Sequence, residues 1–127
     1  EKGYREIVLT GINLGKYGRD LSPPQILTDL LKLLLNLKES FRIHLSSVEP
    51  KEVTSQLMRL VTKDEKPCPH LHIPLQSGSD IILKRMNRDY SYPEYREIVG
   101  ELRKADPEIA ISTDVMVGFP GETGEDF

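Results

Sequence analysis

Polar side chains able to bind a ligand stand at four places where an apolar run of the sequence gives way to turn residues. The four places are Thr10-Gly11-Ile12-Asn13, Ser46-Ser47-Val48-Glu49-Pro50, Pro74-Leu75-Gln76-Ser77-Gly78, and Asp114 followed by Gly118-Phe119-Pro120-Gly121. The carboxylates of Glu49 and Asp114 can accept hydrogen bonds from an amine or a ribose diol, and the Gln76 amide can both donate and accept. We expect these side chains to converge on one polar ligand.

Each of these residues also has a purely structural interpretation. Asp114 lies in an otherwise apolar run, which predicts a buried carboxylate in need of a partner, and this favours a binding role. Glu49 could be an acid at a helix start, but its place at a strand end favours function. For Gln76 and Ser77, binding and helix capping are equally favoured. Arg88 follows a predicted helix, and its position alone indicates a solvated charge.

His70 and His72 are two residues apart, which puts both on one face of a strand. Some zinc hydrolases use such a pair, but a metal site needs a third ligand, and none stands at a suitable spacing. We favour two polar histidines that line a barrel, and a barrel metal hydrolase stays as an alternative. Cys68, between Pro67 and Pro69, is typical of a loop thiol.

Four strand and helix pairs must position these residues. Apolar runs and alternation predict strands over 6–12, 41–48, 70–76 and 110–117, with a turn-rich loop over 11–18. The first predicted helix begins at Ser22-Pro23-Pro24 and ends near Glu39, and the second runs over 53–61. The third leads from a capping box at Ser77 and Asp80 to Met86, and the fourth leads from a second box at Ser91 and Glu94 to Leu102. Strands that alternate with crossover helices predict an α/β fold with a parallel sheet, whose ligands bind beyond the C-terminal strand ends.

Composition narrows the function class. The 127 residues carry a net charge of −3 with scattered basic residues, so the basic stripe of a nucleic-acid platform is missing. No apolar run has the length of a membrane span, and we expect no membrane partner. The single cysteine, Cys68, excludes an internal disulfide and cannot hold an iron–sulfur cluster alone. It indicates a reducing compartment, and we expect a cytoplasmic location.

Both ends of the sequence have the pattern of a domain cut short. Gly3 precedes the first strand as a helix C-cap would, and Thr123 and Asp126 have the spacing of a further capping box. We expect residues 1–127 to be one part of a single core domain, truncated at both ends, with a missing helix on each side.

Four stretches, read together, resemble one known family. They are LTGINLGKYGRDL, RIHLSSVEP, CPHLHIPLQSGSDIILKRMNRDYS and ISTDVMVGFPGETGEDF, and in this order they cover nearly the whole chain. They look like the radical S-adenosylmethionine methylthiotransferases. The details of TGINLGKYGRDL and CPHLHIPLQSGS are most similar to the branch that thiomethylates threonylcarbamoyladenosine in tRNA. The branches that act on isopentenyladenosine in tRNA or on a ribosomal protein share the scaffold and stay as alternatives.

The resemblance implies a partial (β/α) barrel of about four parallel strands with flanking helices, which binds S-adenosylmethionine across its top. In such enzymes a 4Fe–4S cluster cleaves S-adenosylmethionine to a 5′-deoxyadenosyl radical, a second cluster takes part in sulfur insertion, and a second S-adenosylmethionine supplies the methyl group. Four positions match contacts to S-adenosylmethionine in related enzymes: Glu49, Gln76, Arg88 and Asp114. Arg88 is expected to pair with the carboxylate of the ligand, which suits a planar guanidinium. Gly11 and Asn13 stand where relatives bind the methionyl amine, although this sequence has no glutamate there.

The cluster motif C-x3-C-x2-C of this family is absent from the sequence. We therefore expect the 4Fe–4S ligands upstream, and the tRNA contacts in other domains of the intact enzyme. The chain by itself is expected to be inactive and to bind no cluster, and no residue of it is assigned a catalytic role. A non-catalytic RNA-binding module is disfavoured by the scattered basic residues and by an aromatic content of 6%.

Overall fold

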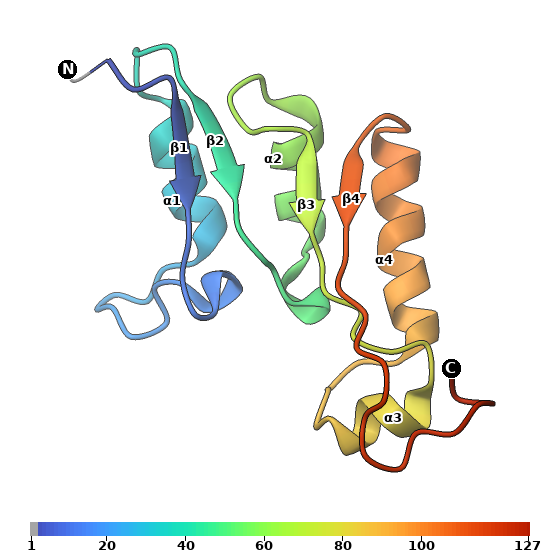
Figure 1. Cartoon of the computed structure of the whole chain (residues 1–127). Helices are drawn as coiled ribbons and strands as arrows, with labels where there is room; N and C mark the ends of the chain where they lie inside the picture. The colour runs from blue at the N-terminus through green and yellow to red at the C-terminus, as the bar shows by residue number, and fades with distance from the viewer. Residues whose placement is uncertain (1–2) are drawn as a thin grey trace.

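Four parallel strands lie side by side in the order of the sequence. A computed structural model describes residues 3–127 and contains the strands β1 (Glu6–Leu9), β2 (Arg42–Leu45), β3 (His70–His72) and β4 (Ala110–Ser112). β1 pairs with β2 and β3 pairs with β4, both in parallel. Parallel bridges from Ile43 to Pro67 and from Ser47 to His72 link the two pairs (Figure 1). The predicted fold, a partial β/α barrel with a parallel sheet, is confirmed.

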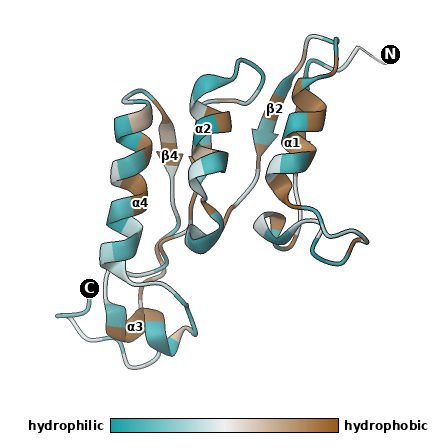
Figure 2. Ribbon diagram, turned by 180° about the vertical axis from the view of Figure 1, so that it is seen from behind, coloured by the Kyte–Doolittle hydropathy of each residue, from teal (hydrophilic) through white to brown (hydrophobic). Residues whose placement is uncertain are grey.

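Helices cover one face of these strands. α1 (Leu27–Leu35), α2 (Ser55–Lys63) and α4 (Tyr92–Ala105) each lie between two consecutive strands in the sequence, and all three stand in front of the strands in Figure 2. In β2 and β3 every second residue, such as Ile43 and Leu71, points to these helices and is buried. The core continues through Leu31, Leu57, Val61, Ile73, Leu102 and Ile109. The intervening strand residues point to the opposite face, which is why that face is polar.

The strands are shorter than the apolar runs that predicted them. Beyond its third residue β4 has only an isolated bridge, between Val115 and Gln76. The Thr113 hydroxyl accepts the N–H of Leu75 at 2.8 Å, so a side chain replaces the backbone acceptor that a longer ladder would use. At the end of the predicted third strand, Pro74 has no N–H to donate. The C-terminal parts of the predicted strands are therefore connections, and these connections carry the candidate site residues.

The first helix begins later than the sequence predicts. Its N-cap is Ile26 and not Ser22, and its last residue is Leu35 and not Glu39. A residue before a proline is driven out of the helical region, and Ser22 and Pro23 both precede one. Residues 18–25 instead form a turn in which the Gly18 carbonyl accepts the N–H groups of Leu21 and Gln25. The loop before this turn contains the short helix η1 (Leu14–Lys16).

The capping predictions have three outcomes. The Ser91 and Glu94 box is confirmed, with reciprocal hydrogen bonds of 2.7 and 3.4 Å at the start of α4. The box at Ser77 and Asp80 is wrong, because Ser79 caps α3 (Asp80–Arg85) and Ser77 accepts the N–H of Ser79. Thr123 and Asp126 exchange the hydrogen bonds of a box, although residues 123–127 form no helix.

The second helix lies two residues later than predicted. The short helix η2 (Pro50–Glu52) precedes it, and Thr54 caps α2 by accepting the N–H of Leu57. Between residues 3 and 127, no helix combines the length and the apolar character that crossing a membrane requires.

Candidate functional site

The candidate residues lie where the sequence places them, on the connections beyond the C-terminal ends of the strands. Asn13 follows β1, Glu49 follows β2, Gln76 follows β3 and Asp114 follows β4. Arg88 stands beyond α3, the helix that lies past the ends of β3 and β4 (Figure 1). The structure joins them in two pairs, one through side chains and the other through the backbone.

Glu49 and Arg88 form the side-chain pair. Nη1 of Arg88 lies 3.1 Å from both carboxylate oxygens of Glu49, and the two side chains are 29% and 37% exposed for Arg88 and Glu49 respectively. Arg88 is turned toward Glu49 by the end of α3. Asn87 adopts a left-handed conformation with a φ of 58°, and the Arg88 N–H bonds the Leu83 carbonyl at 2.9 Å. This hydrogen bond spans six residues and is that of a Schellman motif, so the end of the helix directs the Arg88 guanidinium toward Glu49. Position alone indicated a solvated charge, and that interpretation is wrong.

Gln76 and Asp114 form the backbone pair. The Gln76 N–H bonds the Asp114 carbonyl and the Met116 N–H bonds the Gln76 carbonyl, both at 2.8 Å. Gln76 has a φ of 67°, a left-handed conformation that is unfavourable for a residue other than glycine. Such strain is concentrated at functional sites, where the surrounding structure maintains it. The side-chain amide of Gln76 makes no hydrogen bond with any of residues 3–127.

Tyr90 holds the segment that carries Gln76. Its buried hydroxyl lies 3.1 Å from the Pro74 carbonyl and 3.0 Å from the Leu75 carbonyl. Burial raises the pKa of Tyr90 to about 12, against a smaller opposing effect of the Arg88 charge. The hydroxyl therefore keeps its proton and donates it to these carbonyls. Tyr90 was not among the residues predicted from the sequence, although an aromatic ring with a polar tip is a signal for such a role.

Asp114 is not buried, contrary to the prediction. It lies two residues beyond β4 with a side chain that is 68% exposed, and its apolar neighbours Val115, Met116 and Val117 are exposed as well. The apolar run therefore belongs to a connection and not to a strand. The expected partner nevertheless exists, because Oδ2 of Asp114 lies 3.2 Å from Nε2 of His72.

Two buried polar atoms at the ends of β1 and β2 are unsatisfied. Within residues 3–127, neither Oδ1 of Asn13 nor Oγ of Ser46 has a hydrogen-bond partner. Buried polar groups of this kind are rare, and each calls for a ligand or water. Asn13 was a candidate from the sequence. Gly11 shows no comparable sign, because a Cβ there would meet only the Leu14 backbone, at 3.9 Å or more.

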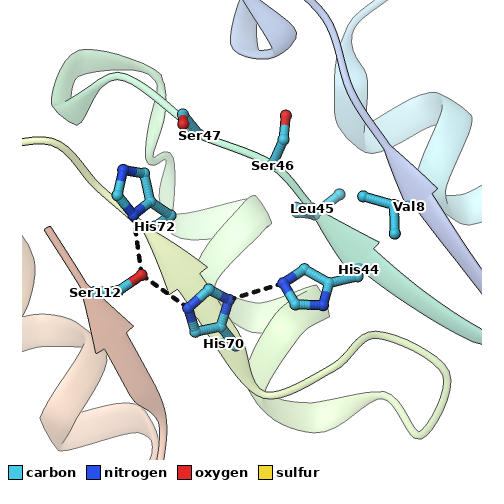
Figure 3. Close-up of a pocket in the computed structure, with 8 residues that line it drawn as sticks. All are labelled: Val8, His44, Leu45, Ser46, Ser47, His70, His72 and Ser112. Atoms are coloured by element: carbon cyan, nitrogen blue, oxygen red, sulfur yellow. Dashed lines mark hydrogen bonds between the residues drawn. The ribbon is translucent and has the colours of Figure 1, made fainter. Parts of the chain in front are cut away.

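His70 and His72 line a shallow pocket of about 340 Å³ on the open face of the sheet (Figure 3). Its lining residues are Val8, His44, Leu45, Ser46, Ser47, His70, His72 and Ser112. Nε2 of His70 lies 2.9 Å and Nδ1 of His72 lies 3.0 Å from the Ser112 hydroxyl. Burial lowers the pKa of His70, and the charges of His44 and His72 lower it further.

The same hydrogen bonds bear on the metal hydrolase alternative. Both ring nitrogens of His70 and both of His72 bond protein groups. In the part of the chain that the structure describes, no three histidine, cysteine or acidic side chains are grouped as metal ligands. No specific observation therefore favours a hydrolase.

Comparisons with known proteins support one family. The profile of the Radical SAM superfamily matches residues 1–127. The chain is 46% identical over 126 residues to the threonylcarbamoyladenosine tRNA methylthiotransferase MtaB of Thermotoga maritima, which covers 99% of this chain and 29% of that protein. It is 42% identical over 126 residues to a tRNA-2-methylthio-N(6)-dimethylallyladenosine synthase of Clostridium botulinum, and the match covers 99% of this chain and 28% of that protein. It is 44% identical over 127 residues to the synthase of the same name from Thermoanaerobacter pseudethanolicus, and the match covers 100% of this chain and 27% of that protein. The chain thus spans less than a third of the length of these curated relatives.

Proposed function

Because this chain belongs to the Radical SAM superfamily, we propose that it is the central part of a tRNA methylthiotransferase and binds S-adenosylmethionine beyond the C-terminal ends of its strands. The ligand carries an amine, a carboxylate and a ribose diol, so it needs donors and acceptors together. Bound beside a 4Fe–4S cluster, it would supply the radical that activates the substrate carbon, and in a second equivalent the methyl group.

The observation that carries the proposal is the pair of unsatisfied buried atoms, Oδ1 of Asn13 and Oγ of Ser46. They lie on the two connections that follow neighbouring parallel strands, at the end of the sheet where ligands of such folds bind. An amide oxygen and a hydroxyl can accept from an amine, and the hydroxyl can also donate. The residues present therefore fit a ligand with the polar groups of S-adenosylmethionine.

The remaining candidates have matching roles in this proposal. Arg88 holds the ligand carboxylate with the guanidinium N–H groups that Glu49 leaves free. Glu49 fixes Arg88 and accepts from the ligand amine. The Gln76 amide and the exposed Asp114 carboxylate hold the ribose hydroxyls. Gly11 is retained only as the neighbour of Asn13 in this connection.

The proposed substrate is threonylcarbamoyladenosine in tRNA. The quoted sequence stretches and the name of the Thermotoga relative, which is 46% identical, support this choice, whereas relatives named for dimethylallyladenosine are 40–44% identical. An assay of the full-length enzyme on tRNAs carrying either modified adenosine distinguishes the two. Methylthio product from the dimethylallyl tRNA alone would overturn the proposed substrate and leave the ligand site standing.

The clusters and the tRNA are proposed to be bound by parts of the enzyme outside these 127 residues, in the cytoplasm where tRNA is modified. A 4Fe–4S cluster requires several thiolates, and this sequence supplies only Cys68, which is buried. The isolated chain is therefore expected to be inactive. Iron and sulfide analysis after anaerobic reconstitution tests this, and stoichiometric cluster in the isolated chain would contradict it.

Calorimetry of S-adenosylmethionine with the full-length enzyme tests the binding site. Asp114→Ala and Arg88→Ala should each weaken binding about tenfold or more, since a hydrogen bond to a charged group is involved. Glu108→Ala and Arg59→Ala are matched controls, because both residues are exposed and neither follows the C-terminal end of a strand: Glu108 precedes β4 and Arg59 lies in α2. Unchanged affinity in both site variants would remove the assignment.

A further inference from the structure

Five polar side chains form one continuous line across the open face of the sheet. Figure 3 shows His44, His70, Ser112 and His72, and Asp114 continues the line beyond His72. Nε2 of His44 in β2 lies 3.1 Å from Nδ1 of His70 in β3. Ser112 in β4 bonds His70 on one side and His72 on the other, at 2.9 and 3.0 Å. His72 then reaches Asp114 at 3.2 Å. The parallel register that sets His72 beside Ser112 makes this line possible.

The hydrogen bonds of this line all run in one direction. An ionised carboxylate only accepts, so Nε2 of His72 carries a proton, and in a neutral His72 ring Nδ1 then accepts from Ser112. The Ser112 hydroxyl has one proton, which is then in use, so its oxygen accepts from Nε2–H of His70. His70 accepts in turn from Nε2–H of His44. Every N–H and O–H of the line thus points toward Asp114, and each histidine has one defined tautomer.

The line ends at His44, whose Nδ1 makes no hydrogen bond within residues 3–127. Nδ1 of His44 faces Oε1 of Glu6 at 3.8 Å, which is beyond hydrogen-bond distance. Burial and two neighbouring histidines lower the pKa of His70, which keeps the middle of the line neutral. No described residue outside the line competes for the Ser112 hydroxyl. Ser112 is therefore the junction on which the orientation of His72 depends.

We propose that the line His44–His70–Ser112–His72 is a positioning device that holds the Asp114 carboxylate for S-adenosylmethionine. This inference rests on the proposed function, which gives Asp114 its role. The Asp114 side chain is 68% exposed, whereas that of His72 is 22% exposed and tied at both ring nitrogens. His72 engages Oδ2 alone, and Oδ1 makes no hydrogen bond within residues 3–127. A carboxylate fixed through one oxygen presents the other to a ligand without losing rotamer freedom on binding.

Variants at the junction test the proposal in the full-length enzyme. Ser112→Ala should weaken S-adenosylmethionine binding about three- to tenfold, the size expected when one preorganised side chain becomes free. Ser112→Thr keeps the hydroxyl and should restore the affinity. Val8→Ala is the control, because Val8 lines the same pocket, is 56% exposed and takes no part in the line.

A second measurement reports the line itself. In ¹⁵N-histidine NMR spectra of the cluster-free full-length enzyme, His72 should be the Nε2–H tautomer, and Ser112→Ala should mix its tautomers while Ser112→Thr does not. Wild-type affinity in Ser112→Ala, with weakened binding in Asp114→Ala, would overturn the positioning role and leave the binding site intact. Wild-type affinity in Asp114→Ala would instead remove Asp114 from the proposed site, and the positioning role with it.

Discussion

Arg88 contacts Glu49 through a single nitrogen, since Nη1 alone lies 3.1 Å from both carboxylate oxygens. A guanidinium has five N–H donors in a fixed plane, so most of them remain free for another acceptor. The pair is therefore an oriented donor group and not a closed ion pair. Both side chains are partly exposed, so the ion pair itself adds little to stability.

Arg88→Lys should separate charge from geometry at this pair. Lysine keeps the positive charge beside Glu49 but loses the planar donors, so S-adenosylmethionine should bind about tenfold more weakly in calorimetry. The free energy of unfolding should change by less than about 0.5 kcal/mol. Binding equal to the wild type would show that only the charge of Arg88 is used.

Gly15→Ala should displace the loop that carries Asn13. A Cβ at position 15 would lie 2.3 Å from Cβ of Glu52, and Arg19 holds the Glu52 carboxylate at 2.8 and 2.9 Å. The clash should lower the free energy of unfolding by about 1–3 kcal/mol, the usual size for overpacking. Urea unfolding of the full-length enzyme measures it.

Two further variants control the Gly15 result. Gly100→Ala in α4 meets open space and should be neutral or stabilising, because alanine is the better helix former. Glu52→Gly removes the opposing Cβ and should restore much of the stability in the Gly15→Ala background. Additive losses in the double variant would contradict the proposed clash.

Tyr90 should make stability fall at alkaline pH. Its pKa is raised from 10.0 to about 12 in the folded protein, so the unfolded chain releases this proton first. The contribution is fully present below about pH 10 and is lost as pH rises through 12. Tyr90→Phe should lower stability at pH 8 by about 1–2 kcal/mol, because two carbonyls lose a donor.

Urea unfolding between pH 8 and 11 checks the Tyr90 prediction. Tyr90→Phe should lose less stability over this range than the wild type. Tyr4→Phe is the matched control, because Tyr4 is 74% exposed, and it should follow the wild type. A Tyr90→Phe variant with the same pH dependence as the wild type would contradict the assignment.

The sequence predicts the order of strands and helices well, because a period of two and a helical period are local properties of the chain. The prediction fails where a contact with a residue far away in the sequence determines the local structure. Thr113 takes the Leu75 N–H and ends β4 early, and no local pattern encodes that choice. The apolar neighbours of Asp114 suggested burial, yet they lie on an exposed connection. The first helix was misplaced because Ser22 and the prolines mimic a helix start.

Position at strand ends predicted Glu49, Gln76 and Asp114 as candidates, and the family resemblance added Arg88, but neither predicted how these residues pair. The contact between His72 and Ser112 depends on the register of β3 against β4, which a shift of one residue would reverse. The Arg88 contact depends on the left-handed Asn87. Both are relations between segments that lie far apart in the sequence or turn on a single backbone angle.

The hydrogen-bond line on the open face has an electrical polarity. Its N–H and O–H dipoles add head to tail, with their positive ends toward Asp114, and each bond polarises the next. The sense of this dipole is set by one residue at its end. A lysine at position 114 would donate instead of accept. Each histidine would then have to carry its proton on the other ring nitrogen, and the Ser112 hydroxyl would have to turn and donate to His70. The acidic character of position 114 therefore determines the protonation pattern of three histidines on two other strands.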